Sequence, residues 1–187
     1  MKLGLTVLRW IVGGLFVGHG TQKLFGWFDG HGLEATAKGF ESMGLRPGRR
    51  HATAAGAAEA GGGALLALGL FTPAAAATLI GVMSTAIRKV HLKNGPWTTN
   101  GGYEYNLVLI AIVFALADVG PGDLSLDHAF GTEVKGPLVA LAALVGGIAG
   151  AEVMTRSSEP ETAQSGETDS APAAPAPRGS EPVPSSA

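Results

Sequence analysis

The stretch TAAGAAEAGGGALLALGL, residues 53–70, decides the fold of this chain. It consists almost entirely of Ala, Gly and Leu, and an apolar run of about 18 residues is typical of a helix that crosses a membrane. A single carboxylate, Glu59, nevertheless lies in its middle. Charged groups inside a membrane span are costly and normally face the interior of a helix bundle. The stretch therefore predicts a helix whose Glu59 is turned inward, toward a partner on another helix.

The composition of the whole chain also favours a membrane protein. Hydrophobic residues make up 46% of its 187 residues and charged residues only 15%, whereas soluble domains are roughly 25% charged. The chain contains no cysteine. This excludes disulfides, iron–sulfur clusters, thiolate ligation of haem and a CxxCH haem attachment site.

Five apolar segments are close to the ~17–25 residues that a membrane-spanning helix needs. They cover residues 3–25, 52–70, 73–90, 103–117 and 137–154, of which the fourth is the shortest. Arg9 interrupts the first segment and no small-residue cleavage site follows it, so we expect a retained helix rather than a signal peptide. Residues 33–48 have apolar positions at helical spacing and predict a short helix at the membrane interface.

The C-terminal residues 157–187 are rich in Pro, Ser and Ala, carry several acidic side chains and contain no aromatic residue. Such a composition cannot bury enough apolar surface to offset the loss of chain entropy on folding. We therefore expect an all-α integral membrane protein that ends in a disordered, acidic tail.

The distribution of Lys and Arg predicts the orientation, because positively charged loops stay in the cytoplasm. The first and third loops carry Lys23, Lys38, Arg46, Arg49, Arg50, Arg88, Lys89 and Lys93. The loops and terminus on the opposite side carry only Lys2 and Lys135. We therefore expect a multi-pass protein with its N-terminus outside and its tail in the cytoplasm.

On four of the predicted helices a charged side chain lies on a stripe of small residues. These side chains are Arg9, Glu59, Arg88 and Glu104. Small residues let helix backbones approach closely in lipid, so the charges are expected to face the bundle interior. For Glu59, both Arg9 and His19 lie at suitable depths in an antiparallel helix pair. Arg9 offers the better bidentate geometry.

Further polar residues gather toward the cytoplasmic ends of the predicted helices. They are His19, Lys23, Arg88, Lys89, His91, Tyr103, Glu104 and Tyr105, with Trp97 beside them. Together they predict a polar pocket with aromatic walls that opens on one side.

Several ordered pieces of the chain resemble the DoxX family of small bacterial membrane proteins. They are Arg9 on the first helix, GHGTQKLFG (18–26), FESMGL (40–45), EAGGGALLALGLFTP (59–73), GYEYNLVLI (102–110) and GPGDLSLD (120–127). The resemblance implies a four-helix membrane bundle over residues 1–128, located in the bacterial plasma membrane. The loop and fifth helix at 129–156 and the tail at 157–187 lie outside the resemblance.

The family is associated with quinone-linked oxidoreductase complexes, including a subunit of a thiosulfate:quinone oxidoreductase. The resemblance therefore implies a subunit or accessory of such a complex, with no redox centre of its own. A bound quinone is then the expected cofactor, and membrane or soluble redox proteins are the expected partners. The positions that match the family pattern are Arg9, Lys23, Glu59, Glu104 and Asp127. Whether the chain has enzymatic activity stays open.

The residues allow a second function as well. A buried Glu with basic residues opposite suits a non-enzymatic carrier of a small solute or proton, or a membrane scaffold for partner proteins. Glu59 is then either a structural ion pair or a proton site. His19 and His91 are more simply hydrogen-bonding groups than haem ligands, so no metal is expected. The lipid bilayer and a second copy of the chain are further expected partners, and nucleic acid is not.

For two groups of residues, structural and functional roles both stay open. Tyr103, Tyr105 and Glu104 either close a quinone headgroup pocket or form an interfacial aromatic belt and a helix start. Asp127 is either a ligand or, more simply, a turn or cap residue. We expect Ser125 or Asp127 to cap a short following turn.

Overall fold

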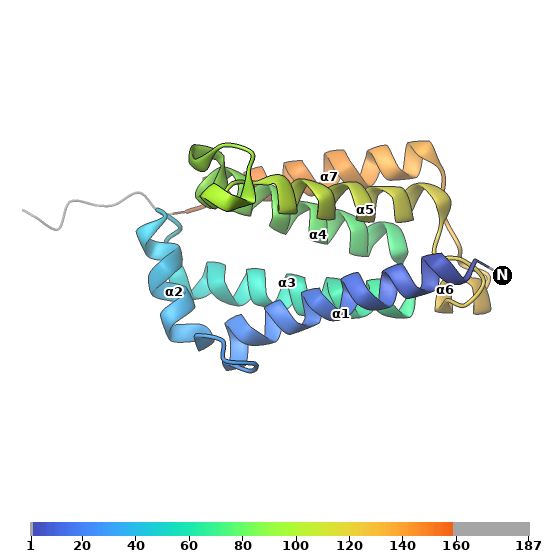
Figure 1. Ribbon diagram of the computed structural model, residues 1–187, viewed down its shortest axis with the longest axis horizontal. Helices are drawn as coiled ribbons and strands as arrows, with labels where there is room; N and C mark the ends of the chain where they lie inside the picture. Colours follow the sequence, from blue (N-terminus) through green and yellow to red (C-terminus); the bar gives the residue numbers. More distant parts are fainter. Residues whose placement is uncertain (1, 159–187) are drawn as a thin grey trace, which may run out of the picture.

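The computed structural model describes residues 2–158, which form seven α-helices and no β-strand (Figure 1). The helices are α1 (Leu3–Phe25), α2 (Gly32–Ser42), α3 (Gly48–Leu68), α4 (Thr72–Ala86), α5 (Glu104–Val119), α6 (Leu126–Ala129) and α7 (Pro137–Arg156). A π-helix, η1 (Ile87–His91), and two 3₁₀ turns, η2 (Leu92–Asn94) and η3 (Thr98–Asn100), link α4 to α5. The all-α prediction is confirmed. The predicted disordered tail lies outside the described residues from residue 159 onward.

The five long helices form two layers (Figure 1). Helices α1 and α3 lie side by side in one layer, and α4, α5 and α7 form the other. Helix α2 crosses one end of the α1–α3 pair, and α6 lies at the opposite end, near the N-terminus. Helix α7 packs against both α4 and α5, so it belongs to the same assembly as these helices. The division into a four-helix bundle and an additional C-terminal helix stays a prediction. The domain boundary at residue 128 stays a prediction.

Glycines set the distance and the register between α1 and α3. A Cβ atom added to Gly13 would lie 2.5 Å from the carbonyl oxygen of Gly63, and one added to Gly20 would lie 2.5 Å from that of Gly56. Side-chain atoms do not fit at such distances, so only glycine lets the two backbones touch here. The two contacts fix an antiparallel register in which the start of α1 lies beside the end of α3.

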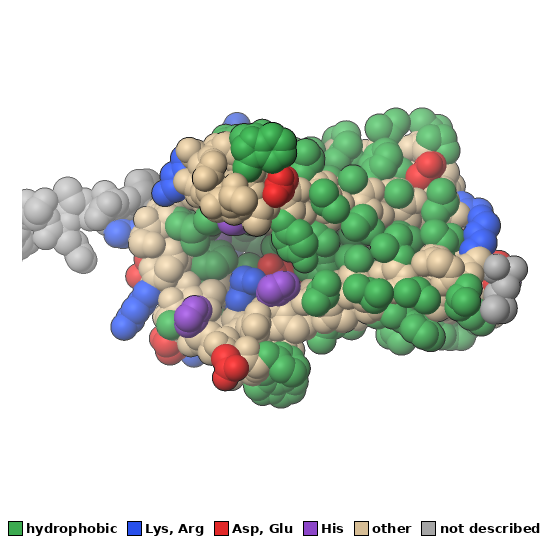
Figure 2. Space-filling model, in the orientation of Figure 1, with side chains coloured by type: hydrophobic (Ala, Val, Ile, Leu, Met, Phe, Trp, Pro, Cys, Tyr) green, Lys and Arg blue, Asp and Glu red, His purple; other side chains and the backbone are tan. Residues whose placement is uncertain are grey.

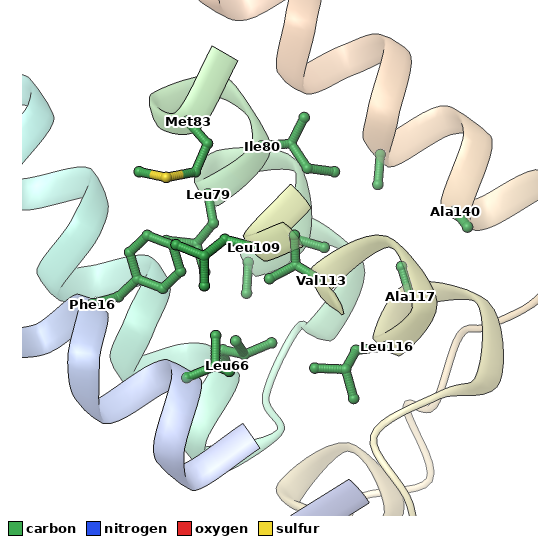
Figure 3. Packing of buried hydrophobic residues seen from close by; sticks show 14 residues of the cluster. Phe16, Leu66, Leu79, Ile80, Met83, Leu109, Val113, Leu116, Ala117 and Ala140 are labelled. Atoms are coloured by element: carbon green, nitrogen blue, oxygen red, sulfur yellow. The ribbon is translucent and has the colours of Figure 1, made fainter. Parts of the chain in front are cut away.

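A buried apolar cluster joins the two layers. Phe16 from α1, Leu66 from α3, Leu79 from α4 and Val113 from α5 point toward one another in Figure 3. Each of these side chains is at most 2% exposed. These buried side chains are closely packed, and this packing fixes the position of one layer relative to the other. Ala140 and Ala143 extend the cluster to α7.

The outward-facing surface of the helices is apolar. Trp10 on α1, Val108 on α5 and Val145 on α7 are among the large hydrophobic side chains that are more than half exposed. Charged side chains gather toward the two ends of the molecule in Figure 2. Soluble proteins rarely expose contiguous apolar surface on this scale. An apolar body with charged ends is the distribution expected of a protein surrounded by lipid.

Within residues 2–158, two helices, α1 and α7, are long and apolar enough to cross a membrane by length and composition. The sequence predicted five such helices. α4 and α5 have only 15 and 16 residues, against the roughly 20 that span the hydrocarbon layer as a straight helix. In addition, the predicted single helix over residues 73–90 ends early, because η1 replaces its last turn.

We predict that Gly63→Ala destabilises the protein and that Gly61→Ala does not. A Cβ at Gly63 would lie 2.6 Å from the carbonyl oxygen of Gly13 and 2.7 Å from Phe16 Cβ. Overpacking of this kind typically lowers the free energy of unfolding by about 1–3 kcal/mol. Gly61 lies on the same helix, where an added Cβ would meet nothing within 4 Å. Thermal unfolding of both variants in one detergent measures the difference, and equal melting temperatures would show that this close approach is unimportant.

Candidate functional site

A cavity of about 650 Å³ lies between the two layers, toward the end where α2 crosses them. Its volume falls within the roughly 300–1,000 Å³ of typical small-molecule sites. Most of its wall consists of Ala, Gly, Val, Leu and Met side chains. The wall also includes the polar residues His19, Lys23, His51, Glu59, Lys89, His91, Tyr105 and Asn106. Figure 2 shows charged and His side chains gathered at a hollow between the layers.

The Lys23–Glu59 ion pair is the polar centre of this cavity. Lys23 Nζ lies 2.5 Å from Glu59 Oε2, so the contact joins the last turn of α1 to the middle of α3. Glu59 is only 3% exposed, and Lys23 is partly buried. A buried carboxylate is tolerated here because the ammonium compensates its charge and donates a hydrogen bond to it. This contact explains how an apolar helix accommodates Glu59.

The prediction that Arg9 or His19 pairs with Glu59 is wrong. The glycine contacts place Gly20 beside Ala60, so Glu59 lies level with the end of α1, about three turns from Arg9. His19 is exposed, and its Nδ1 lies 3.0 Å from Gln22 Oε1. Lys23 forms the pair because helical side chains lean toward the N-terminus of their helix, which brings its ammonium to Glu59.

Arg9 and Asp127 form a second polar site at the opposite end of the bundle. Arg9 is fully buried, and its Nη2 donates to the carbonyl oxygen of Leu124 at 2.5 Å. Asp127 is also buried. It accepts hydrogen bonds from the backbone N–H of Phe71 (2.8 Å), from that of Thr72 (3.0 Å) and from the Thr72 hydroxyl (2.8 Å). The structure thus gives Asp127 a capping role at the start of α4.

The fit around Arg9 depends on Gly69, the residue that ends α3. Gly69 has a φ of 63°, and a Cβ atom there would collide with Nη1 of Arg9. The Nε and Nη1 atoms of Arg9 are buried and have no hydrogen-bond partner within residues 2–158. The negative charge of Asp127 compensates part of the guanidinium charge. Arg9 and Asp127 together therefore fasten the loop after α5 to the turn between α3 and α4.

The segment from α6 to α7 is held by side-chain contacts of its own. Ser125 Oγ accepts a hydrogen bond from the backbone N–H of His128 and so caps α6. Glu133 pairs with Lys135 at 2.9 Å and lies 3.6 Å from His128. The hydrogen bond from Lys135, followed by smaller contributions that include His128, holds the pKa of Glu133 below its ordinary value.

Three other predicted site residues lie outside the cavity wall. Arg88 forms an ion pair with Glu152 on α7. Glu104 accepts a hydrogen bond from the backbone N–H of Thr98 at 3.0 Å and thereby holds the turn η3 against the start of α5. Tyr103 precedes α5 and does not line the cavity. These residues shape the loop at the cavity end without reaching its interior.

The predicted polar pocket thus contains His19, Lys23, Glu59 and Tyr105 from the set of candidate site residues. Its wall is mainly aliphatic rather than aromatic. Of the described residues, Phe40 and Tyr105 are the aromatic ones that line it, and Trp97 is exposed elsewhere. Residues 2–158 contain no group of three or more His, Cys, Asp or Glu side chains that could hold a metal ion.

Residues 4–92 of the chain match the DoxX family. The match covers just under half of the 187 residues and supports membership of the DoxX family. The match runs from α1 through η1, so it includes Arg9, Lys23 and Glu59, whereas Glu104 and Asp127 lie beyond it. No curated protein and no solved structure matches the chain. The DoxX match and the exposed apolar surface both support a membrane protein.

Two buried polar residues of the cavity in this DoxX protein were missed by sequence reasoning. They are His51, at the start of α3, and Asn106, on α5. Asn106 heads a buried stripe that continues with Leu109 and Val113, and this helical spacing was visible in the sequence. His51 offered no such signal. Its Nε2 lies 3.2 Å from the Oγ of Ser158, a contact between distant parts of the chain.

We predict that Asp127→Ala lowers the free energy of unfolding by about 3 kcal/mol, because three donors lose a charged acceptor and the Arg9 guanidinium loses its compensating charge. Asp118→Ala is the matched control. Asp118 is a partly buried carboxylate on α5 without a side-chain hydrogen bond or ion pair to another residue of 2–158. Thermal unfolding in detergent compares the two variants. A similar loss in both would contradict the capping role.

Proposed function

We propose that this DoxX protein binds the headgroup of a membrane quinone in its cavity and acts as a subunit or accessory of a quinone-linked oxidoreductase complex in the bacterial plasma membrane. The cavity carries the proposal, because it combines a mainly apolar wall with the Lys23–Glu59 pair. A quinone combines a flat ring bearing two carbonyl oxygens with a long apolar tail. The apolar wall suits the tail, and the ion pair suits the carbonyl oxygens of the ring.

The residues of the cavity wall fit such a headgroup. Lys23, Tyr105 and Asn106 line it and carry N–H or O–H groups that can donate to carbonyl oxygens. Met83 and the Ala and Gly residues of α3 and α7 leave apolar room for the ring and the first part of the tail. When bound, a quinone supplies two-electron, two-proton redox chemistry, with electrons delivered by a partner redox protein.

The Lys23–Glu59 pair is suited to holding a proton beside the headgroup. Lys23 Nζ donates a hydrogen bond to Glu59 Oε2, so the two groups hold a proton between them at the cavity wall. Glu59 also orients the Lys23 ammonium, because this ammonium forms no other hydrogen bond or ion pair within the described residues. The pair therefore both positions a donor and retains a proton in an apolar cavity.

We further propose that the long helices cross the plasma membrane with the N-terminus outside and Arg156 in the cytoplasm. The basic residues at the α2 end of the molecule support this orientation, because positive residues remain on the cytoplasmic side. In this arrangement α2 lies along the cytoplasmic surface, and Arg49 pairs there with Glu34 at 2.7 Å. The cavity then opens toward the cytoplasmic leaflet.

We predict that quinone copurifies with the full chain in mild detergent and that Glu59→Gln lowers the bound amount. The variant keeps the side-chain volume but removes a charge-assisted hydrogen bond that orients Lys23, so affinity should fall roughly tenfold. Glu34→Gln, on exposed α2, is the control and should retain quinone. Solvent extraction followed by chromatography quantifies quinone per chain. Absence of quinone from the unaltered protein, or full retention by Glu59→Gln, would overturn the proposal.

A second candidate function is transport of a proton or small solute without redox chemistry. The observation that favours it is the burial of Glu59 at a cavity that other helices complete, because an ionisable group in such a place often marks a transport pathway. Uptake into sealed vesicles that depends on Glu59, by protein that carries no quinone, would support this function over the first.

A further inference from the structure

The cavity carries a second polar group, which lies nearer the α2 end of the molecule than the Lys23–Glu59 pair. We call it the mouth cluster and define it as His51 on α3 together with Lys89 and His91 on η1. All three residues line the cavity. Lys89 and His91 belong to a π-helix, an element that is rare and frequently found at functional sites.

The antiparallel α3–α4 hairpin brings the cluster together. A Cβ atom added to Gly62 would lie 3.1 Å from Leu79, which sets the register of the two helices. From that contact toward α2, α3 runs back to His51 and α4 runs forward to η1. His51 therefore lies level with η1. His51 precedes Glu59 by two helical turns, so the cluster lies about 12 Å farther toward the α2 end.

The mouth cluster has a positive charge that no described residue compensates. Lys89 forms no hydrogen bond or ion pair within residues 2–158. Glu59 is the one carboxylate in the described part of the cavity wall, and it is already paired with Lys23. Glu152 on α7 is already paired with two other cations, Arg88 and Arg156. An unpaired ammonium beside an apolar cavity favours the binding of an anion.

The two imidazoles of the cluster are oriented by neighbouring groups. His91 Nδ1 lies 2.7 Å from the carbonyl oxygen of Gly101, and His51 Nε2 lies 3.2 Å from Ser158 Oγ. Each ring therefore keeps its other nitrogen without a partner among residues 2–158. The Lys89 ammonium donates to the acceptor oxygens of a phosphate group, and each imidazole adds a donor from its second nitrogen when the ring is protonated, because a neutral ring has only one N–H.

We propose that the mouth cluster binds the phosphate group of an anionic membrane lipid whose acyl chains lie along the apolar wall of the cavity. Basic pockets between membrane helices on the cytoplasmic side are suited to lipid headgroups of this kind. The apolar wall favours a lipid over a soluble phosphate, which shares the same anion chemistry. The proposal goes beyond quinone binding and does not depend on it, because a quinone headgroup is uncharged and is placed at Lys23 and Glu59, about 12 Å away along α3.

The experiment titrates the full chain in neutral detergent with phosphatidylglycerol and with diacylglycerol that has identical acyl chains, and counts bound lipid by native mass spectrometry. We expect phosphatidylglycerol to bind more tightly, and Lys89→Gln to weaken it by roughly tenfold through loss of a charge-assisted hydrogen bond. Diacylglycerol binding should not change in that variant. Equal binding of the two lipids by the unaltered protein would overturn the proposal.

Lys93→Gln is the matched control, because it removes one positive charge from an exposed residue of the same connection that does not line the cavity. It should bind phosphatidylglycerol like the unaltered protein; an effect equal to that of Lys89→Gln would show general surface attraction and overturn the site. If inorganic phosphate at similar concentration displaced the lipid, the cluster would bind phosphate from solution. That result would overturn the lipid as its ligand. Quinone retention by Lys89→Gln, beside its loss in Glu59→Gln, separates this proposal from the first.

Discussion

Direct backbone contact between α1 and α3 is the constraint on which the rest of the structure depends. Gly13 and Gly20 on one helix meet Gly63 and Gly56 on the other at distances that exclude any side chain. In lipid, burial of apolar groups does not drive helices together, so close van der Waals contact must do so. The same contacts fix the register of the pair. The Lys23–Glu59 ion pair between these two helices depends on that register.

The register separates the buried charges into two sites with different characters. At one end, Asp127 accepts from two backbone N–H groups and one hydroxyl, and Arg9 donates to a loop carbonyl. These contacts tie loops to helix ends. At the other end, Lys23 and Glu59 hold each other beside a cavity. The first site is therefore structural, whereas the second places an ion pair where a ligand can reach it.

The cavity exists because the two layers touch over only part of their length. The apolar cluster around Phe16, Leu79 and Val113 joins them. Toward α2, small residues on α3 and α7 and the π-helical turn η1 leave space that larger or more regular elements would fill. Polar groups reach this space at two levels along α3, the ion pair at Glu59 and the mouth cluster nearer the α2 end. An apolar wall with polar groups at two levels suits amphiphilic molecules from the surrounding membrane.

The sequence alone establishes the helical class, the apolar helices and the inward turn of Glu59, because composition and helical spacing are local properties. It also pointed to Lys23 and Tyr105, which line the cavity. It did not identify the partner of Glu59, since the choice between Arg9 and Lys23 depends on how far α1 is shifted along α3. Only the packed glycines decide that shift. The burial of His51 and the change from α-helix to π-helix at Ile87–His91 likewise arise from contacts between segments distant in the chain, which no local pattern records.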